Sequence, residues 1–417
     1  MSKMSQMSSQ NRRYFLKSTG LAMASFAAAP AFLVRTAMGQ ESTASGQDKP
    51  ILIAVFQRGA ADGISMVVPF GDRSYTSARP QIAVAAPRSG GADTAAIDLD
   101  GFFGFHPSLA PLKSIYDEGH LAMVHAVGSP DNTRSHFDAQ DYMEAGAPGN
   151  KGVADGWLNR YMQGSPKPGN TAFRAIALDA NMPRSLMGPA PALAMARIQE
   201  FDVRGPNDRR QPSGGGELSA AFEAMWKNST FDAIRMLRNA NPQRFQPENG
   251  ARYPGGQFGQ GLLQMSQLIK ADVGLEVGFL DIGGWDTHAN QPGQLTQRLR
   301  EFGEGLSAFY RDLGDRMRNV VVLTMTEFGR SIKQNGSGGT DHGHASALFV
   351  MGGPVKGRKV YGKWPGLAPD QLFEGRDLAL TTDFRDVFSE VLNKHMRAAD
   401  STKVFPGWRP GQSLGII

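Results

Sequence analysis

Ile51-Leu52-Ile53-Ala54-Val55-Phe56 is an unbroken apolar run, and Gln57-Arg58-Gly59-Ala60-Ala61-Asp62-Gly63 follows it directly. A continuous apolar run with this β-branched content predicts a central strand that is buried on both faces. The glycines of the following stretch predict a permissive loop that presents the Asp62 carboxylate at the edge of a sheet. Asp62 is then either a metal ligand or, like many aspartates before glycine, an ordinary turn residue.

Similar apolar runs recur along the chain. We predict further strands at residues 121–127, 174–178, 276–282, 320–325 and 347–351, and helices at 107–118, 135–144, 218–239, 259–271 and 294–318. Strands that alternate with helices indicate an α/β fold with a central, mostly parallel sheet. In such sheets ligands bind beyond the carboxyl ends of the strands. The segment 182–216, rich in Pro, Gly and Arg, is predicted to be an excursion or a lid.

The first 39 residues resemble a twin-arginine (Tat) export signal. Arg12-Arg13-Tyr14-Phe15-Leu16-Lys17 precedes an uncharged segment at 21–34, and small residues follow at 37–39. The apolar segment is shorter than the about 20 residues that span a bilayer, which favours a cleaved signal over a membrane anchor or a buried helix. We therefore expect a signal at 1–39, a linker at 40–49, one domain at 50–417, passage through the Tat machinery, and a periplasmic or extracellular location.

The charge and cysteine content restrict the possible functions. The formal net charge is +5, but the export segment holds Lys3, Arg12, Arg13, Lys17 and Arg35 and no acidic residue, so the mature chain is near neutral. The sequence thus gives no case for nucleic-acid binding. The chain has no cysteine, which excludes disulfides and thiolate metal sites.

Histidines and carboxylates gather in two short stretches, Trp285-Asp286-Thr287-His288 and Gly339-Thr340-Asp341-His342-Gly343-His344. Residues i and i+2 point the same way only in an extended chain, so Asp286 can converge with His288, and His342 with His344, if both stretches are extended. We expect these polar clusters to end strands. Imidazole and carboxylate together suit zinc, manganese or iron better than calcium, and we expect one or two divalent ions, zinc or manganese. Asp286, His288, Asp341, His342 and His344 are therefore candidate ligands.

Two further sites follow predicted strands. Glu327, after the strand at 320–325, is predicted to be buried and so needs a partner, either Arg330 or a metal ion. Arg134-Ser135-His136 opens a helix, where Ser135 either caps the helix or acts as a metal-activated nucleophile, with Arg134 holding phosphate oxygens. His136 is a ligand, an acid or a packing residue. The four histidines at 106, 120, 125 and 395 are predicted to be structural.

These motifs, in this order, resemble an exported bacterial family, domain of unknown function 1501, within the alkaline phosphatase and sulfatase superfamily. The stretches that carry the resemblance are 58–63, 134–137, 284–288, 326–330 and 339–343. The resemblance implies an alkaline-phosphatase-like three-layer sandwich. It also implies hydrolysis of a phosphate or, less so, a sulfate ester of a small molecule or polymer. The implied ligands are Asp62, Asp286, His288, Glu327, His342 and His344, and the implied nucleophile is Ser135.

Three features differ from the usual superfamily pattern. Asp286 and His288 are closer together, Glu327-Phe328 stands where Asp-His is typical, and no cysteine is available for the formylglycine of a standard sulfatase. Our functional hypothesis is an exported metal-dependent hydrolase. The alternative is a non-catalytic protein that is stabilised by metal and binds or assembles with a cell-envelope partner.

Overall fold

The central sheet is the main feature of the computed structural model, which describes residues 49–87, 94–165, 173–198 and 245–417. The strand order is β11 (Lys359–Tyr361), β5 (Leu121–Gly128), β10 (Ser346–Gly352), β9 (Val320–Met325), β1 (Ile51–Gln57), β8 (Val277–Ile282), β6 (Ala175–Ala177) and β7 (Leu193–Ala194), with β12 (Thr382–Asp383) pairing with β5. The apolar run at 51–56 therefore forms an interior strand, as predicted.

One strand runs against the others. β1 pairs in parallel with β8 and β9, whereas β10 pairs antiparallel with both β5 and β9. The carboxyl ends of β1, β5, β8 and β9 consequently meet at one edge of the sheet. The stretch at 339–344 does not end a strand, contrary to our expectation, but precedes β10. Because β10 is reversed, its amino end brings this stretch to the same edge.

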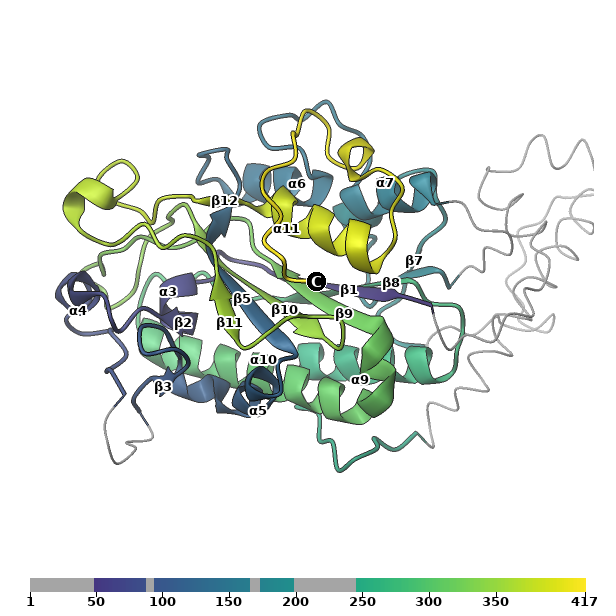
Figure 1. Cartoon of the computed structure of the whole chain (residues 1–417), viewed down its shortest axis with the longest axis horizontal. Coiled ribbons are helices and arrows are strands. Elements are labelled where there is room, and N and C mark those ends of the chain that lie inside the picture. Colours follow the sequence, from purple (N-terminus) through teal and green to yellow (C-terminus); the bar gives the residue numbers. More distant parts are fainter. Residues whose placement is uncertain (1–48, 88–93, 166–172, 199–244) are drawn as a thin grey trace, which may run out of the picture.

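Helices cover both faces of the sheet and complete a three-layer sandwich (Figure 1). On one face lie α5 (Lys113–Asp117), α9 (Gln257–Lys270) and α10 (Gln291–Leu313); on the other lie α6 (His136–Ala145), α7 (Trp157–Gly164) and α11 (Phe384–Glu390). Side chains of β1 alternate between the two layers. Ile53 and Val55 join the apolar cluster with α9 and α10, and Leu52, Ala54 and Phe56 join the cluster with α7 and α11. This two-sided burial explains why β1 reads as a continuous apolar run.

The six predicted strands are confirmed to within a residue or two, and the smaller elements were missed. The helix predicted at 107–118 begins as a 3-10 helix (Pro107–Leu112), because Pro111 cannot donate a backbone hydrogen bond, and continues as α5. Elements too short to carry a periodic signal are α3 (Gly63–Met66), α4 (Arg73–Ala78) and a small sheet of β2 (Val67–Val68), β4 (Gly104–Phe105) and β3 (Ile97–Asp98).

Several predictions fall outside the described residues. These are the export segment, the helix at 218–239 and the part of the 182–216 segment beyond residue 198. Within the described ranges, no helix combines the length and the apolar composition needed to cross a membrane.

Candidate metal centre

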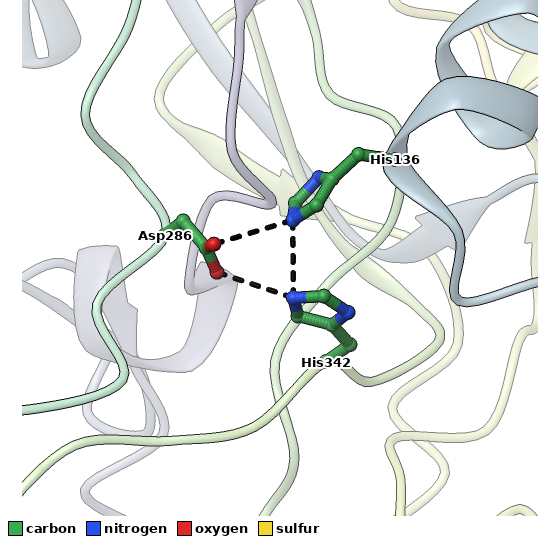
Figure 2. A group of neighbouring side chains, drawn as sticks. All are labelled: His136, Asp286 and His342. Atoms are coloured by element: carbon green, nitrogen blue, oxygen red, sulfur yellow. Dashed lines mark hydrogen bonds and ion pairs between the residues drawn. The ribbon is translucent and has the colours of Figure 1, made fainter.

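Three imidazole rings and one carboxylate converge at the edge of the sheet where the strand ends meet. Nε2 of His342 lies 3.0 Å from Nε2 of His136 and 3.1 Å from Nε2 of His288. Asp286 completes the group: its Oδ1 lies 3.2 Å from His342 Nε2 and 3.0 Å from His288 Nε2, and its Oδ2 lies 3.4 Å from His136 Nε2. Figure 2 shows His136, Asp286 and His342 pointing toward one another. The ligand atoms of these three residues lie within 4.8 Å of one another, so they can hold a metal ion.

The four side chains come from three separate segments. His136 is the first residue of α6, after β5; Asp286 and His288 follow β8; and His342 precedes β10. The predicted convergence of Asp286 with His288 at i, i+2 spacing occurs. His342 and His344 do not converge, because His344 is buried and stacks on Phe373 with ring centroids 4.3 Å apart. Burial lowers the pKa of His344.

Each ring is fixed through its other nitrogen. Nδ1 of His136 faces Glu327 Oε1 at 2.8 Å, Nδ1 of His288 faces Asp341 Oδ1 at 3.3 Å, and Nδ1 of His342 faces the backbone carbonyl of Arg134 at 2.9 Å. A carboxylate or carbonyl oxygen only accepts, so these contacts place the proton on Nδ1 in each neutral ring. The three Nε2 lone pairs then face one another. Metal-binding histidines are typically anchored in this way.

Facing lone pairs repel each other, and a cation between them would remove the repulsion. Without a metal ion, one of the rings would have to take up a proton to place a positive charge between the facing nitrogens. The hydrogen bond to Glu327 raises the pKa of His136, whereas burial lowers the pKa of His342. A divalent ion held by His136, Asp286 and His342 would take up the lone pairs of both imidazoles, because a histidine needs its lone pair to bind metal.

A buried arginine holds Asp286. The side chain of Arg330 is fully buried, and its Nη1 donates to Asp286 Oδ1 at 2.5 Å. Its other nitrogens donate to the hydroxyl and the backbone carbonyl of Thr340. Burial alone would raise the pKa of Asp286, but Arg330 and the neighbouring histidines lower it, so this carboxylate stays ionised. Arg330 is therefore the partner of Asp286, not of Glu327.

Glu327 lies behind His136 and supports it. The buried Oε1 accepts hydrogen bonds from His136 Nδ1, from the Gly59 backbone N–H at 2.8 Å and from Gln140 Nε2 at 2.9 Å. Burial raises the pKa of Glu327, but these hydrogen bonds outweigh it and lower the pKa overall. We predicted Glu327 to be a metal ligand. In the structure its carboxylate instead holds the ring of His136 in place.

The loop after β1 is shaped around this anchor. Gly59 has φ of +114° and Ala60 has φ of +66°, a conformation that glycine adopts readily and alanine does not. At Gly59 a Cβ atom would lie 2.7 Å from the backbone nitrogen of Asp286, so the loops after β1 and β8 touch there. Phe328 packs on the imidazoles of His136 and His342, with ring centroids 5.0 and 5.1 Å away. Phe328 thus forms an apolar wall of the site.

Asp62, a predicted ligand, does not reach this group. Its carboxylate is buried and pairs with Arg79 through two contacts, Nη1 to Oδ2 at 2.5 Å and Nη2 to Oδ1 at 3.1 Å. Ser65 and Gln291 also donate to Oδ2. Burial raises the pKa of Asp62, but Arg79 lowers it below its ordinary value. The structure gives Asp62 the role of a buried ion-pair partner.

The two residues predicted to be catalytic have structural partners. The Ser135 hydroxyl caps α6 by accepting the Asp138 backbone N–H at 3.5 Å, which is one of the two roles that the sequence left open. Nε and Nη2 of Arg134 contact Asp377 Oδ2 at 3.1 and 2.6 Å, and Nη2 contacts Glu374 at 2.7 Å. These carboxylates occupy two of the three guanidinium nitrogens of Arg134, the side chain that was predicted to hold phosphate.

His136 is the site residue that sequence analysis left undecided. Its signal was a histidine at the first position of a helix that follows a central strand, and only the fold shows which way it points. The other four histidines have contacts that fit a structural role: His125 and His395 bond to backbone carbonyls, His106 accepts the Ser108 N–H, and His120 contacts the Tyr310 hydroxyl.

A family model described as protein of unknown function (DUF1501) matches residues 49–407. The chain belongs to this family. A search of curated protein sequences found no match. The family confirms the resemblance that the motifs indicated.

Among solved structures, the chain is similar to the lipoteichoic acid synthase LtaP from Listeria monocytogenes, at 7% identity and a TM-score of 0.32. The match covers 71% of this chain and 61% of that one, so the chain spans less than two thirds of the synthase. It is also similar to an alkaline phosphatase superfamily protein from Vibrio parahaemolyticus (6% identity, TM-score 0.32, 77% and 68% covered). A third similar structure is the alkaline phosphatase of the Antarctic bacterium TAB5 (9%, 0.32, 74% and 93%). These identities assign no residue a role.

Proposed function

We propose that the protein is an exported metal-dependent hydrolase that acts on a phosphate ester, with a sulfate ester as the less favoured substrate. The observation that carries the proposal is the convergence of His136, Asp286 and His342, whose ligand atoms all lie within 4.8 Å of one another. His288 Nε2 lies 3.1 Å from His342 Nε2, and each of the three rings is held by an acceptor at Nδ1. Nothing in a stable fold requires such an arrangement, because facing lone pairs repel. A bound cation removes this repulsion.

The donor set favours a transition metal. Three imidazole nitrogens and a carboxylate oxygen suit zinc or manganese, whereas calcium and magnesium prefer oxygen ligands alone. Two ligands at about 2.0–2.1 Å from one tetrahedral ion lie about 3.3 Å apart. The contacts among His342, His136, His288 and Asp286 are 3.0 to 3.4 Å long, close to that spacing.

In this centre the chain's own groups orient the ligands and supply charge. Arg330 keeps Asp286 ionised and in place, Glu327 sets the His136 ring, and Phe328 limits water on one side. A metal ion supplies a Lewis acid that polarises an ester oxygen and makes water a better nucleophile. The Ser135 hydroxyl accepts the Asp138 N–H in its helix cap, and we favour water over Ser135 as the attacking group.

Metal content and ester turnover test the proposal together. The mature protein, purified and analysed for metals, should hold a transition metal and hydrolyse a generic phosphomonoester or phosphodiester. His342→Ala should lose both metal and activity, whereas His120→Ala, at a histidine outside the site, should keep both. A wild-type protein that is metal-free and inert contradicts the proposal.

The export part of the proposal rests on the sequence of residues 1–39. Replacing Arg12 and Arg13 by lysine should keep the protein in the cytoplasm, because the Tat machinery reads the arginine pair. An unchanged periplasmic or extracellular fraction would count against this export route.

One observation favours the alternative of a metal-stabilised binding or assembly protein in the cell envelope. The two residues predicted to be catalytic, Arg134 and Ser135, both serve structural contacts. For such a protein, His342→Ala should lower the melting temperature, and the wild type should turn over no ester even when loaded with metal.

A further inference from the structure

A cavity opens between the first turns of α10, the 3-10 helix at 107–112 and the segment at 81–84. Its volume is about 490 Å³, which is within the range of small-molecule sites, roughly 300–1,000 Å³. Its lining includes His106, Pro111 and Leu295, and none of the four side chains of the metal centre belongs to it. The cavity is therefore separate from the site described above.

His106 places an unused hydrogen-bond donor in this cavity. The residue is only 8% exposed, and its Nδ1 accepts the Ser108 backbone N–H at 3.1 Å. An acceptor at Nδ1 leaves the proton of the neutral ring on Nε2. Nε2 has no hydrogen-bond partner among the described residues, yet it is not one of the unpartnered atoms that are closed off from solvent. Its N–H therefore points to the open space that His106 lines.

The other two buried polar residues of the lining, Ser65 and Gln291, form a floor whose hydrogen-bonding groups are already used. The Ser65 hydroxyl donates to Asp62 Oδ2 at 2.8 Å and accepts from Arg79 and Gln291. The Gln291 amide oxygen accepts from two threonine hydroxyls, and its nitrogen donates to Asp62. A ligand hydroxyl at His106 would bring a donor for which this floor has no free acceptor, whereas a carbonyl or ether oxygen only accepts.

The charges around the cavity cancel. Burial lowers the pKa of His106 to about 4, outweighing the opposite effect of the Asp62 charge, so the ring is neutral at pH 7. Arg300 and Glu304, both exposed, line the cavity with opposite charges. Behind the floor, Asp62 is paired with Arg79. Burying a charged group among neutral and apolar walls costs more than burying an uncharged one, so the cavity favours an uncharged ligand.

We propose that this cavity binds an uncharged organic molecule through an acceptor-only oxygen, a carbonyl or an ether, that accepts the Nε2–H of His106. The apolar part of the molecule packs against the aliphatic lining, which includes Ile82, Val84 and Leu295. A ligand oxygen that reaches this donor gives it the partner that the described residues do not supply. The proposal goes beyond the hydrolase function and does not depend on it, because the cavity holds none of the metal ligands.

Acetophenone and 1-phenylethanol test the proposal as a matched pair of probes. Their shapes are similar, but only acetophenone has an acceptor-only oxygen. In an NMR titration of the mature protein with ¹⁵N-labelled histidine rings, acetophenone should shift the His106 Nε2 signal saturably. It should also bind about fivefold or more tightly than 1-phenylethanol. The ring of His120, which contacts Tyr310 outside the cavity, should not shift.

Two variants remove the donor in different ways. His106→Ser keeps a capping oxygen for the Ser108 N–H, whereas His106→Phe keeps an aromatic ring of similar size. Each should weaken acetophenone binding on the order of tenfold, measured from the NMR signals of the probe, and should abolish its preference over 1-phenylethanol. His120→Ala is the matched control and should leave both affinities unchanged. Thermal melting identifies the variants that fold.

Three results would overturn the proposal. The first is the absence of a saturable shift at His106 up to the solubility limit of acetophenone, and the second is equal affinity for the two probes. The third is an unchanged acetophenone affinity in a folded His106→Ser or His106→Phe protein. Metal content should be the same in these variants and the wild type, and a loss of metal in folded His106→Ser would contradict the separation of the cavity from the metal centre.

Discussion

Replacing Glu327 with glutamine should weaken metal binding without removing a ligand. Glutamine keeps an acceptor oxygen where Oε1 now meets Gly59 N–H and His136 Nδ1, so the shape and these two hydrogen bonds survive. Its amide nitrogen replaces Oε2, which accepts from the Thr326 hydroxyl, so that one contact is lost. The negative charge that makes His136 more basic is lost. Removing outer partners of metal-bound histidines typically lowers metal affinity by about 10–100-fold, or ~1.4–2.7 kcal/mol. Because glutamine keeps the geometry, we expect about tenfold.

Asp341→Asn is the matched control. It removes the corresponding charge at His288, but the Asp341 side chain is 56% exposed and its contact is 3.3 Å long. Exposed pairs are screened by water, so the loss should stay within about threefold. The assay is zinc titration of chelator-stripped protein against a competing chelator, with thermal melting to confirm that each variant folds.

A double-mutant cycle decides whether Glu327 acts through His136. In a His136→Ala background, Glu327→Gln should have no further effect on zinc affinity. The reasoning is refuted if Glu327→Gln binds zinc as tightly as wild type, or if Asp341→Asn costs more affinity than Glu327→Gln.

Three further predictions concern the surroundings of the site. Ser135→Ala should lower the free energy of unfolding by about 1 kcal/mol through loss of the cap, whereas Ser135→Asn should keep both the cap and ester turnover; an inactive, metal-loaded Ser135→Asn would make Ser135 the nucleophile. Gly59→Ala should displace Asp286, because the added Cβ would lie 2.7 Å from the Asp286 backbone nitrogen. We expect the free energy of unfolding to fall by ~1–3 kcal/mol and metal binding to weaken. An unchanged metal affinity would show that the two loops move independently. Burial raises the pKa of Asp281 to about 7, so the folded protein keeps a proton there that the unfolded chain releases; the stability is present below about pH 4 and is lost as the pH rises through 7. Between pH 5 and 8 the free energy of unfolding, measured by urea titration, should fall by on the order of 1–3 kcal/mol less in Asp281→Asn than in wild type. An equal fall with pH in the two proteins would contradict this.

The sequence predicted the strands well because their signal is local. A buried parallel strand must be apolar on both faces, so β1 and β9 could be placed from composition alone. The pairing of Asp286 with His288 was also predictable, since spacing along an extended chain fixes side-chain direction. The helix cap at Ser135 belongs to the same class of local features, although the sequence could not exclude a catalytic role for it.

The ligand set could not be completed from local pattern. His136 and His342 are 206 residues apart in the chain, and Asp62 and Glu327 each follow a central strand. From sequence, His342, Asp62 and Glu327 were candidate ligands, the last two with other possible roles, and the role of His136 was left open. Which of them meet depends on where each loop turns after its strand. Asp62 forms an ion pair with Arg79, and Arg134 forms one with Asp377; neither partner belongs to a motif that we identified in the sequence.

The sequence by itself determined the α/β class, the sheet strands and the chemical nature of the site, because these depend on residue type and on spacing over a few residues. Only the tertiary structure decided that β10 runs backward and so brings His342 to the same edge as Asp286. It also decided that Glu327 supports His136, and that Arg134 pairs with Asp377. Each of these outcomes depends on the pairing of distant segments, which is set by the packing of the whole sheet and its helices.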